Sequence, residues 1–413
     1  MKADRSETAY LEEIVARLWP GAAIQRRLWP MAGTGEHGRH GFVVLPHGGR
    51  PRLLVTRDRR LAAAQLRGYQ TSATGRARAK GRLAAALARV GALGVLPPTW
   101  CIGPGADGQD IGAYLEEVLD RPVQVSVHVG PPRAVRKPVL QVLDPTTREV
   151  VAFAKVGVND LTRQLVAREA SNLTELEQRR LETIVAPLVM HHGEWRGMEV
   201  LVQSALRPAT VKRPDQALLE SGLLELSNLC GRSIGRLGDH PYTDKLRARI
   251  RALPSHSGGE VLARALDDVV AAAGDAPFRF GAWHGDLTPW NMAGDGNRLL
   301  IWDWEHFESP VPLGYDVLHH HVHSAVRAGT RPDVAMAGLS AKAATVSPAF
   351  QEADEARRLL GRLYAIDMAT RYLADGEGER GTGLGAVGSW LGAALGTPLN
   401  DAETGAAPTS PSR

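Results

Sequence analysis

Two short motifs near residue 300 constrain this chain more than any other part of its sequence. Residues 284–291 read His-Gly-Asp-Leu-Thr-Pro-Trp-Asn, and residues 301–305 read Ile-Trp-Asp-Trp-Glu. In the arrangement H-x-D-x-x-x-x-N, the Asp accepts or orients the proton of an attacking hydroxyl, and the Asn binds magnesium. A second Asp then holds the metal against phosphate groups. The pattern therefore indicates a phosphoryl-transfer site that contains Asp286, Asn291 and Asp303.

The segments on either side of the first motif predict how it is held. Phe278 to Trp283 precedes it and Arg298 to Trp302 follows it, and both are apolar enough to read as strands. A catalytic loop of this type is expected between two strands, so this context supports the interpretation of the motif. His284 is expected to hold this loop through its ring nitrogens. Glu305, the second acid of the D-x-E sequence, is a further candidate metal ligand.

Glycine follows the His of the first motif, and D-x-E replaces the D-F-G of protein kinases. In both respects the motifs resemble the aminoglycoside phosphotransferase and choline kinase-like family. The resemblance covers roughly residues 120 to 395. It implies an α+β, bilobal protein kinase-like fold, with an antiparallel-sheet N-lobe and a mostly helical C-lobe. It also implies Mg²⁺ as the cofactor and ATP as the phosphoryl donor.

A kinase-like N-lobe needs a Lys that contacts the nucleotide, and the sequence supplies a candidate. Pro138 to Leu143 and Val150 to Val156 are apolar runs around an Asp-Pro-Thr-Thr turn, so they predict a hairpin. Lys155 lies on its second strand, where a buried amine is costly unless it is paired. In the following helical segment, Asp160 to Arg180, the leucine spacing favours Glu169 as its partner. The alternative is a solvated carboxylate.

The predicted connection between the lobes lies at Gly197 to Leu206, an apolar strand that runs into a polar connector. Backbone groups near Gln203 and Ala205 are expected to meet the adenine. The loop at 129–137 lacks the G-x-G-x-x-G of protein kinases, and its two prolines remove N–H donors. Arg133 is expected to contact phosphate instead of these N–H groups, and Arg136 or Lys137 are alternatives. The sequence is equally compatible with a turn in which all three basic side chains are solvated.

Composition fits an intracellular enzyme of more than one domain. At 413 residues the chain exceeds the size of a single core, and it contains no run of 18 apolar residues that would predict a membrane span. Its first ten residues lack the apolar stretch of a secretory signal. Two cysteines are too few for an oxidised scaffold, so a cytoplasmic location is expected.

Residues 1–120 are predicted to form an α/β extension that packs on the N-lobe. A hairpin is expected around 42–56, and helices are expected at 58–66, 76–90 and 110–119. Residues 1–140 hold 21 Lys and Arg against 11 Asp and Glu, so an acidic protein or peptide is a possible partner. Nucleic-acid binding is not expected, because the basic tract at 76–82 has no interleaved aromatic residues.

The remaining predicted domains are the N-lobe at 121–205, the C-lobe at 206–399 and a disordered tail at 400–413. Within the C-lobe, helices are expected at 214–237, 244–253 and 260–273. The resemblance implies that Asp316 braces the catalytic loop. His319 and His323 share one helical face, but a zinc site would need more ligands than these two.

The sequence as a whole predicts Mg-ATP-dependent phosphoryl transfer to a hydroxyl of a small molecule. An aminoglycoside, a sugar, an amino alcohol or a biosynthetic intermediate all remain open as acceptors. A cationic acceptor would favour an acidic pocket, and four C-terminal acids either supply one or lie on a helical surface: Glu352, Asp354, Glu355 and Asp367. The alternative functions are a Ser/Thr peptide kinase and a pseudokinase-like binding module.

Overall fold

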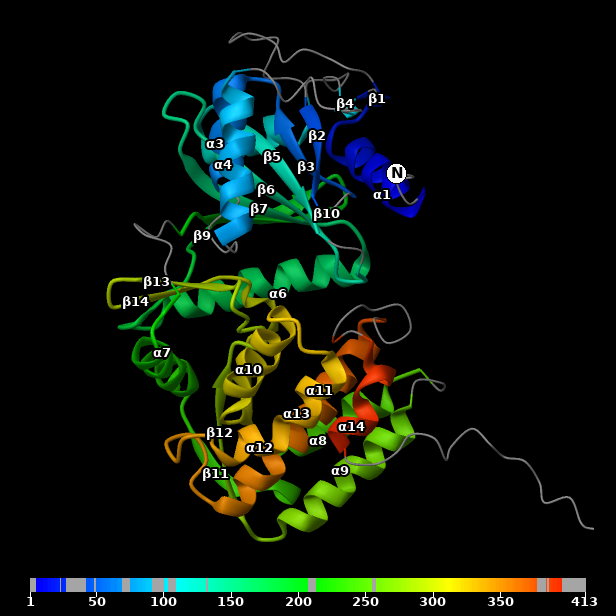
Figure 1. Cartoon of the computed structure of the whole chain (residues 1–413), viewed down its shortest axis with the longest axis vertical. Coiled ribbons are helices and arrows are strands. Elements are labelled where there is room, and N and C mark those ends of the chain that lie inside the picture. Colours follow the sequence, from blue (N-terminus) through cyan, green and yellow to red (C-terminus); the bar gives the residue numbers. More distant parts are fainter. Residues whose placement is uncertain are drawn as a thin grey trace, which may run out of the picture. The chain divides into compact units, whose positions relative to one another are not determined.

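The computed structural model describes residues 5–22, 24–26, 42–47, 50–68, 75–90, 100–102, 109–130, 133–206, 213–254, 258–376, 384 and 386–395. The chain forms two compact units (Figure 1). Unit 1 comprises Met1–Gly222 and Pro289–Phe307, and unit 2 comprises Leu223–Thr288 and Glu308–Arg413. The chain therefore passes from unit 2 back to unit 1 inside the predicted catalytic loop.

Unit 1 is built on one antiparallel sheet that contains nine of the described strands. In spatial order they are β1 (Ile24–Arg26), β4 (Trp100–Ile102), β2 (Phe42–His47), β3 (Arg50–Thr56), β5 (Gln124–Val129), β6 (Pro138–Leu143), β7 (Val150–Gly157), β10 (Met198–Ser204) and β9 (Val189–Trp195). Leu54 of β3 pairs with Val127 of β5. The N-terminal hairpin therefore extends the sheet that carries the predicted Lys155 strand.

Alternating side chains give this sheet two buried faces. On one face, α1 (Arg5–Leu18) and α5 (Ile111–Leu119) pack against apolar residues of β5, β6, β7 and β10. On the opposite face, α3 (Arg59–Gly68) and α4 (Gly75–Arg89) cover β2 and β3. Arg17 of α1 also donates a hydrogen bond to the carbonyl of Val158, 2.9 Å away. The extension and the predicted N-lobe thus share a single core.

Helix α6 (Asp160–Glu177) follows β7 directly and is fixed against it. Asn159 and Thr162 form a reciprocal capping box at its N-terminus. A Cβ on Gly157 would lie 2.6 Å from the Cα of Arg163, so only glycine allows this close approach. Nearby, β13 (Met292–Asp295), β14 (Arg298–Ile301) and β8 (Ile184–Val185) form a small three-stranded sheet.

Unit 2 is mostly helical around the antiparallel strands β11 (Ser233–Arg236), β12 (Pro277–Trp283) and β15 (Glu308–Pro312). The helix α7 (Gln216–Asn228) runs across the boundary between the units. The other described helices are α8 (Pro241–Arg251), α9 (Gly259–Ala273), α10 (Tyr315–Arg327), α11 (Pro332–Ala337), α12 (Leu339–Ala344), α13 (Asp354–Ala374) and α14 (Leu391–Leu395).

The expected α+β class, with an antiparallel sheet followed by mostly helical structure, is confirmed. One expected helix is wrong in part, because α7 ends at Asn228 and residues 233–236 pair with β12 instead. The domain boundaries stay predictions, and the tail at 400–413 lies outside the described residues. Within the described part of the chain, no helix has the length and apolar character needed to cross a membrane.

Candidate active site

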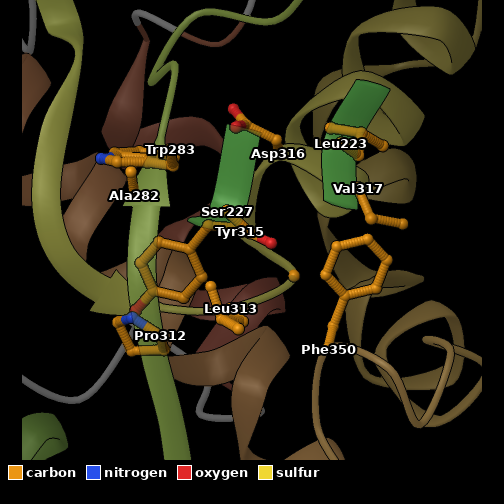
Figure 2. Close-up of a pocket in the computed structure, with 11 residues that line it drawn as sticks. Leu223, Ser227, Ala282, Trp283, Pro312, Leu313, Tyr315, Asp316, Val317 and Phe350 are labelled. Atoms are coloured by element: carbon orange, nitrogen blue, oxygen red, sulfur yellow. The ribbon is translucent and has the colours of Figure 1, made fainter. Parts of the chain in front are cut away.

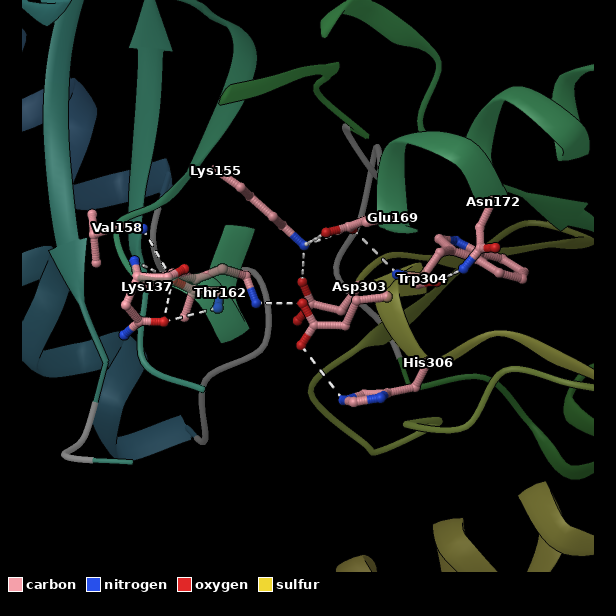
Figure 3. A network of polar contacts seen from close by, with 11 residues as sticks. Lys137, Lys155, Val158, Thr162, Glu169, Asn172, Asp303, Trp304 and His306 are labelled. Carbon is pink, nitrogen blue, oxygen red and sulfur yellow. Dashed lines mark hydrogen bonds and ion pairs between the residues drawn. The ribbon is translucent and has the colours of Figure 1, made fainter. Parts of the chain in front are cut away.

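The centre of the candidate site in unit 1 is a buried ion pair. The Nζ of Lys155 lies 2.6 and 2.7 Å from the two carboxylate oxygens of Glu169 (Figure 3). Both side chains are almost fully buried, at 3% and 0% exposure. Burial alone lowers the pKa of Lys155, but Asp303 and Glu169 reverse this effect and hold the pKa above its usual value. Lys155 is therefore a permanent cation, and the predicted pairing with Glu169 is present.

The strand register places Gln203 on the same face of the sheet as Lys155. Lys155 pairs with Leu201, and Phe153 pairs with Gln203 two residues along. The alternate residues of β7 and β10, such as Ala154 and Val202, point into the opposite core. Gln203 is buried, and its side-chain oxygen has no hydrogen-bond partner within the described part of the chain. Ala205 follows β10 and is half-buried.

A strained turn brings the predicted metal ligands together. Asp303 follows β14 with φ 69° and ψ 57°, a left-handed conformation that is uncommon outside glycine. Its carboxylate bonds the Nζ of Lys155 (Figure 3). Asn291 lies opposite Trp302, the residue before Asp303, because Met292 pairs with Ile301 and the N–H of Trp302 donates to the Asn291 carbonyl at 3.1 Å. The sequence placed Asn291 and Asp303 in one site, and the hairpin β13–β14 supplies the geometry.

Glu169 also holds the turn at Asp303 and Trp304 through a hydrogen bond. The backbone N–H of Trp304 donates to a carboxylate oxygen of Glu169 at 3.2 Å, and Asn172 donates to the Trp304 carbonyl at 2.7 Å. The indole N–H of Trp304 donates to the carbonyl of Ile301 at 3.0 Å. Helix α6 therefore sets the positions of both the Lys155 ammonium and the Asp303 turn.

Three basic residues lie in the loop before β6, and Lys137 is the one that contacts the acidic residues around Lys155. Its ammonium bonds the carboxylate of Glu305. Arg136 stacks its guanidinium 3.9 Å from the ring centre of Tyr10, and Arg133 is exposed. The phosphate contact expected for Arg133 stays a prediction, and the structure points to Lys137 as the better placed cation.

The predicted catalytic loop is held by side chains of unit 2. Buried Asp316 accepts the backbone N–H groups of His284 and Gly285, at 2.8 and 3.3 Å. Arg371 donates to the Gly285 carbonyl at 2.7 Å, and Gly285 itself has a φ of 82°. The Nδ1 of His284 accepts the N–H of Asp286 at 3.1 Å. The expected roles of Asp316 as a brace and His284 as a holder of the loop fit these contacts.

His319 was not predicted to take part in this site, yet it contacts the catalytic candidate directly. Its Nε2 lies 3.1 Å from an oxygen of Asp286, and its Nδ1 lies 2.9 Å from the hydroxyl of Tyr364. Burial, with Arg371 nearby, holds the pKa of His319 well below its usual value, so the ring is neutral. The Nε2–H then donates to the carboxylate of Asp286, and Tyr364 donates to Nδ1. His319 thus fixes the orientation of the Asp286 carboxylate.

The pKa of Asp316 is shifted from its usual value, which the sequence motif does not indicate. Burial raises its pKa to about 7, against the opposing effect of two backbone N–H groups. It also lines a small pocket with Ser227, Tyr315 and Phe350 (Figure 2). The volume of this pocket, about 10 Å³, is at the lower limit for one water molecule. The pocket is therefore too small for an acceptor substrate.

The raised pKa of Asp316 predicts how stability depends on pH. Between about pH 4 and 7 the unfolded state has lost this proton and the folded state keeps it, so stability should fall as pH rises and level off above 7. The full effect is at most about 4 kcal/mol, for a shift of about three pKa units. Denaturant unfolding at pH 5, 6, 7 and 8 measures it. Asp316→Asn should remove the slope, and an equal slope in both proteins would contradict this assignment.

The four C-terminal acids considered as an acceptor pocket lie in local ion pairs. Each of them is paired with an arginine, and Asp367 is also buried and accepts a hydrogen bond from Tyr242. The pairs are Arg279–Glu352, Arg357–Asp354, Arg358–Glu355 and Arg249–Asp367. The exposed positions of Glu352 and Asp354 fit the helical-surface alternative, and an acidic pocket for a cationic acceptor stays a prediction.

Comparisons with known proteins give the following similarities. No protein-family model matches the sequence, and no curated protein matches it. Among solved structures, the chain is similar to a thermostable mutant of an aminoglycoside phosphotransferase, with 14% identity, a TM-score of 0.46, and coverage of 68% of this chain and 96% of that chain. It is similar to a putative fructosamine-3-kinase from Haemophilus somnus, with 13% identity, a TM-score of 0.41, and coverage of 69% and 96%. It is also similar to a choline kinase from Streptococcus pneumoniae, with 15% identity, a TM-score of 0.38, and coverage of 63% and 89%.

Proposed function

We propose that the protein is a Mg-ATP-dependent phosphotransferase that moves the γ-phosphoryl group to a hydroxyl of a small molecule. The observation that carries this proposal is the buried cluster of Lys155, Glu169 and Asp303. Burying such charges is unfavourable unless they are paired, and an apolar core would serve stability as well. A permanently charged Lys beside a strained, half-exposed Asp is instead the arrangement that a nucleotide phosphate and its metal require.

The residues of unit 1 fit a magnesium nucleotide. The cluster holds three carboxylates against the ammonium groups of Lys155 and Lys137, so one negative charge is in excess. Asp303 and Asn291 would hold the metal through oxygen atoms, the ligands that Mg²⁺ prefers, with Glu305 as a further candidate. When bound, Mg²⁺ neutralises charge on the phosphate oxygens. The unpaired oxygen of Gln203 fits an amino group such as that of adenine.

Unit 2 supplies the group that acts on the acceptor. Asp286 accepts the proton of the acceptor hydroxyl as the hydroxyl oxygen attacks the γ-phosphorus, and the bond from that phosphorus to the bridging oxygen breaks to release ADP. His319 holds one oxygen of Asp286 through a neutral ring, so it orients the carboxylate without placing a positive charge beside it. Arg371 and Asp316 hold the loop around it.

The function is tested by transfer of labelled phosphate from ATP with Mg²⁺ to a panel of aminoglycosides, sugars, amino alcohols and Ser/Thr peptides. Label on one class of small molecule supports the proposal and identifies the acceptor class. Label on peptide alone supports the peptide-kinase alternative. A folded protein that binds Mg-ATP and neither transfers nor hydrolyses it supports the pseudokinase alternative.

Asp303→Asn is expected to raise the Mg²⁺ concentration needed for half-maximal transfer by about tenfold or more, because a neutral amide replaces a charged ligand. Asn also tolerates the left-handed backbone at this position, so the fold is retained. Initial rates across a Mg²⁺ series at fixed ATP measure the change. Asp295→Asn, on the neighbouring strand β13, is the matched control. An unchanged Mg²⁺ requirement would remove Asp303 from the set of metal ligands.

A further inference from the structure

Three potential metal ligands meet in unit 2 outside the magnesium cluster. One ligand atom from each of Asp286, His319 and His323 lies within 4.8 Å of the others. The two histidines come from successive turns of α10, and their ring centres are 4.3 Å apart. The sequence offered only this pair, and the fold supplies the carboxylate as the third ligand.

We propose that Asp286, His319 and His323 bind one divalent transition-metal ion, such as Zn²⁺, and that the bound ion inhibits phosphoryl transfer. Two imidazoles and a carboxylate suit zinc, cobalt and nickel, whereas Mg²⁺ prefers oxygen ligands. Three protein ligands leave a fourth position open, as in exchangeable sites and unlike closed structural ones. The magnesium ligands proposed above are different residues, so the two ions would not share a site.

The geometry requires little change. Ligand atoms on a tetrahedral zinc ion lie about 3.3 Å apart, given metal–ligand bonds of about 2 Å. The Nε2 of His319 is already 3.1 Å from the Asp286 oxygen. The ligand atoms of the three residues lie within 4.8 Å of one another, so the ring of His323 has to move by at most about 1.5 Å to complete the set, which a side-chain rotation on a fixed helix provides.

The surroundings of His319 also favour a metal ligand. A ligating His is usually held by a hydrogen bond from its other ring nitrogen, and Tyr364 provides that partner 2.9 Å from Nδ1. In the metal-free protein Nε2–H donates to Asp286, so metal binding at Nε2 moves this proton to Nδ1. On metal binding, Nδ1–H becomes the donor and the Tyr364 hydroxyl accepts. Arg371 opposes a cation here, so we expect weaker binding than in a structural zinc site.

Inhibition follows from the identity of the third ligand. A metal on Asp286 takes the carboxylate that would otherwise accept the proton of the acceptor hydroxyl. This half of the inference rests on the proposed phosphotransferase function, whereas the binding half does not.

The test is a Co²⁺ titration of the full, untagged chain, followed by the visible absorption of the bound ion and by displacement with Zn²⁺. Wild type is expected to bind one equivalent. His323→Asn should weaken binding by at least about tenfold, since even residues that only support a ligand have effects of 10–100-fold. His321→Asn, an exposed His on the same helix, is the matched control and should bind as wild type does.

No binding by wild type, or equal binding by His323→Asn, would overturn the proposal. Circular dichroism checks that this variant is folded, and His323→Gln replaces it if it is not. Zn²⁺ at saturating Mg-ATP should inhibit transfer by wild type and by His321→Asn, with inhibition shifted to at least tenfold higher Zn²⁺ in His323→Asn. Bound Zn²⁺ without inhibition would overturn the inhibitory role. Metal binding that depends on His323, with no transfer under any condition, would instead contradict the proposed function and leave the metal site standing.

Discussion

Replacing Asp286 by Asn is expected to lower kcat for phosphoryl transfer by about 10²–10⁴-fold, the usual contribution of a positioned general base. The amide cannot accept the proton of the acceptor hydroxyl. It can still accept the hydrogen bond from His319, because its carbonyl oxygen replaces the carboxylate oxygen that lies 3.1 Å from Nε2. The loss should therefore appear in kcat, with the fold and the loop retained.

Three measurements separate this effect from a general loss of structure. Steady-state rates of Asp286→Asn should fall, while KM for ATP and the thermal shift produced by Mg-ATP stay within about twofold, because the nucleotide groups belong to unit 1. Asp268→Asn, an exposed acid on α9, is the control and should retain the wild-type rate. If Asp286→Asn keeps a kcat close to that of wild type, Asp286 is not the base and the acceptor side of the proposal is wrong.

The contacts among Lys155, Glu169 and the Asp303 turn in unit 1 could be predicted because local patterns determine them. Lys155 stands in a strand whose alternate residues are apolar, and such a residue must find an opposite charge. Glu169 then follows from the helical periodicity of the next segment. The pair Asn291 and Asp303 is separated by one short hairpin, so sequence spacing and three-dimensional proximity coincide.

The contacts around Asp286 in unit 2 could not be predicted, because no local pattern encodes them. His319 and Asp286 are 33 residues apart in the sequence, and Tyr364 and His319 are 45 apart. Contacts over such separations produce no recognisable sequence motif. The ion pair of Lys137 with Glu305 joins residues 168 positions apart, so the sequence did not predict it. Strand β11 was missed because four residues form it, and its pairing with β12 outweighs the weak helical pattern of the segment.

The largest stability effect is expected from Lys155→Met. It leaves the carboxylate of Glu169 buried at 0% exposure without its cation, and breaking a buried pair in this way costs about 3–5 kcal/mol. The free energy of unfolding of unit 1, measured by urea denaturation, should fall by that amount. Lys245→Met, which removes an exposed partner of Glu308, is the control and should change stability by less than about 1 kcal/mol.

The double variant Lys155→Met/Glu169→Met distinguishes a role in function from one in stability. Two apolar side chains of similar length fill the space of the pair, and such replacements of buried ion pairs are often neutral or stabilising. The double variant should therefore recover most of the lost stability, yet the thermal shift produced by Mg-ATP should remain absent. If the shift returned with stability, Lys155 would have no part in binding the nucleotide. If stability stayed low, the fold itself would require the pair, because Glu169 accepts the backbone hydrogen bond of Trp304.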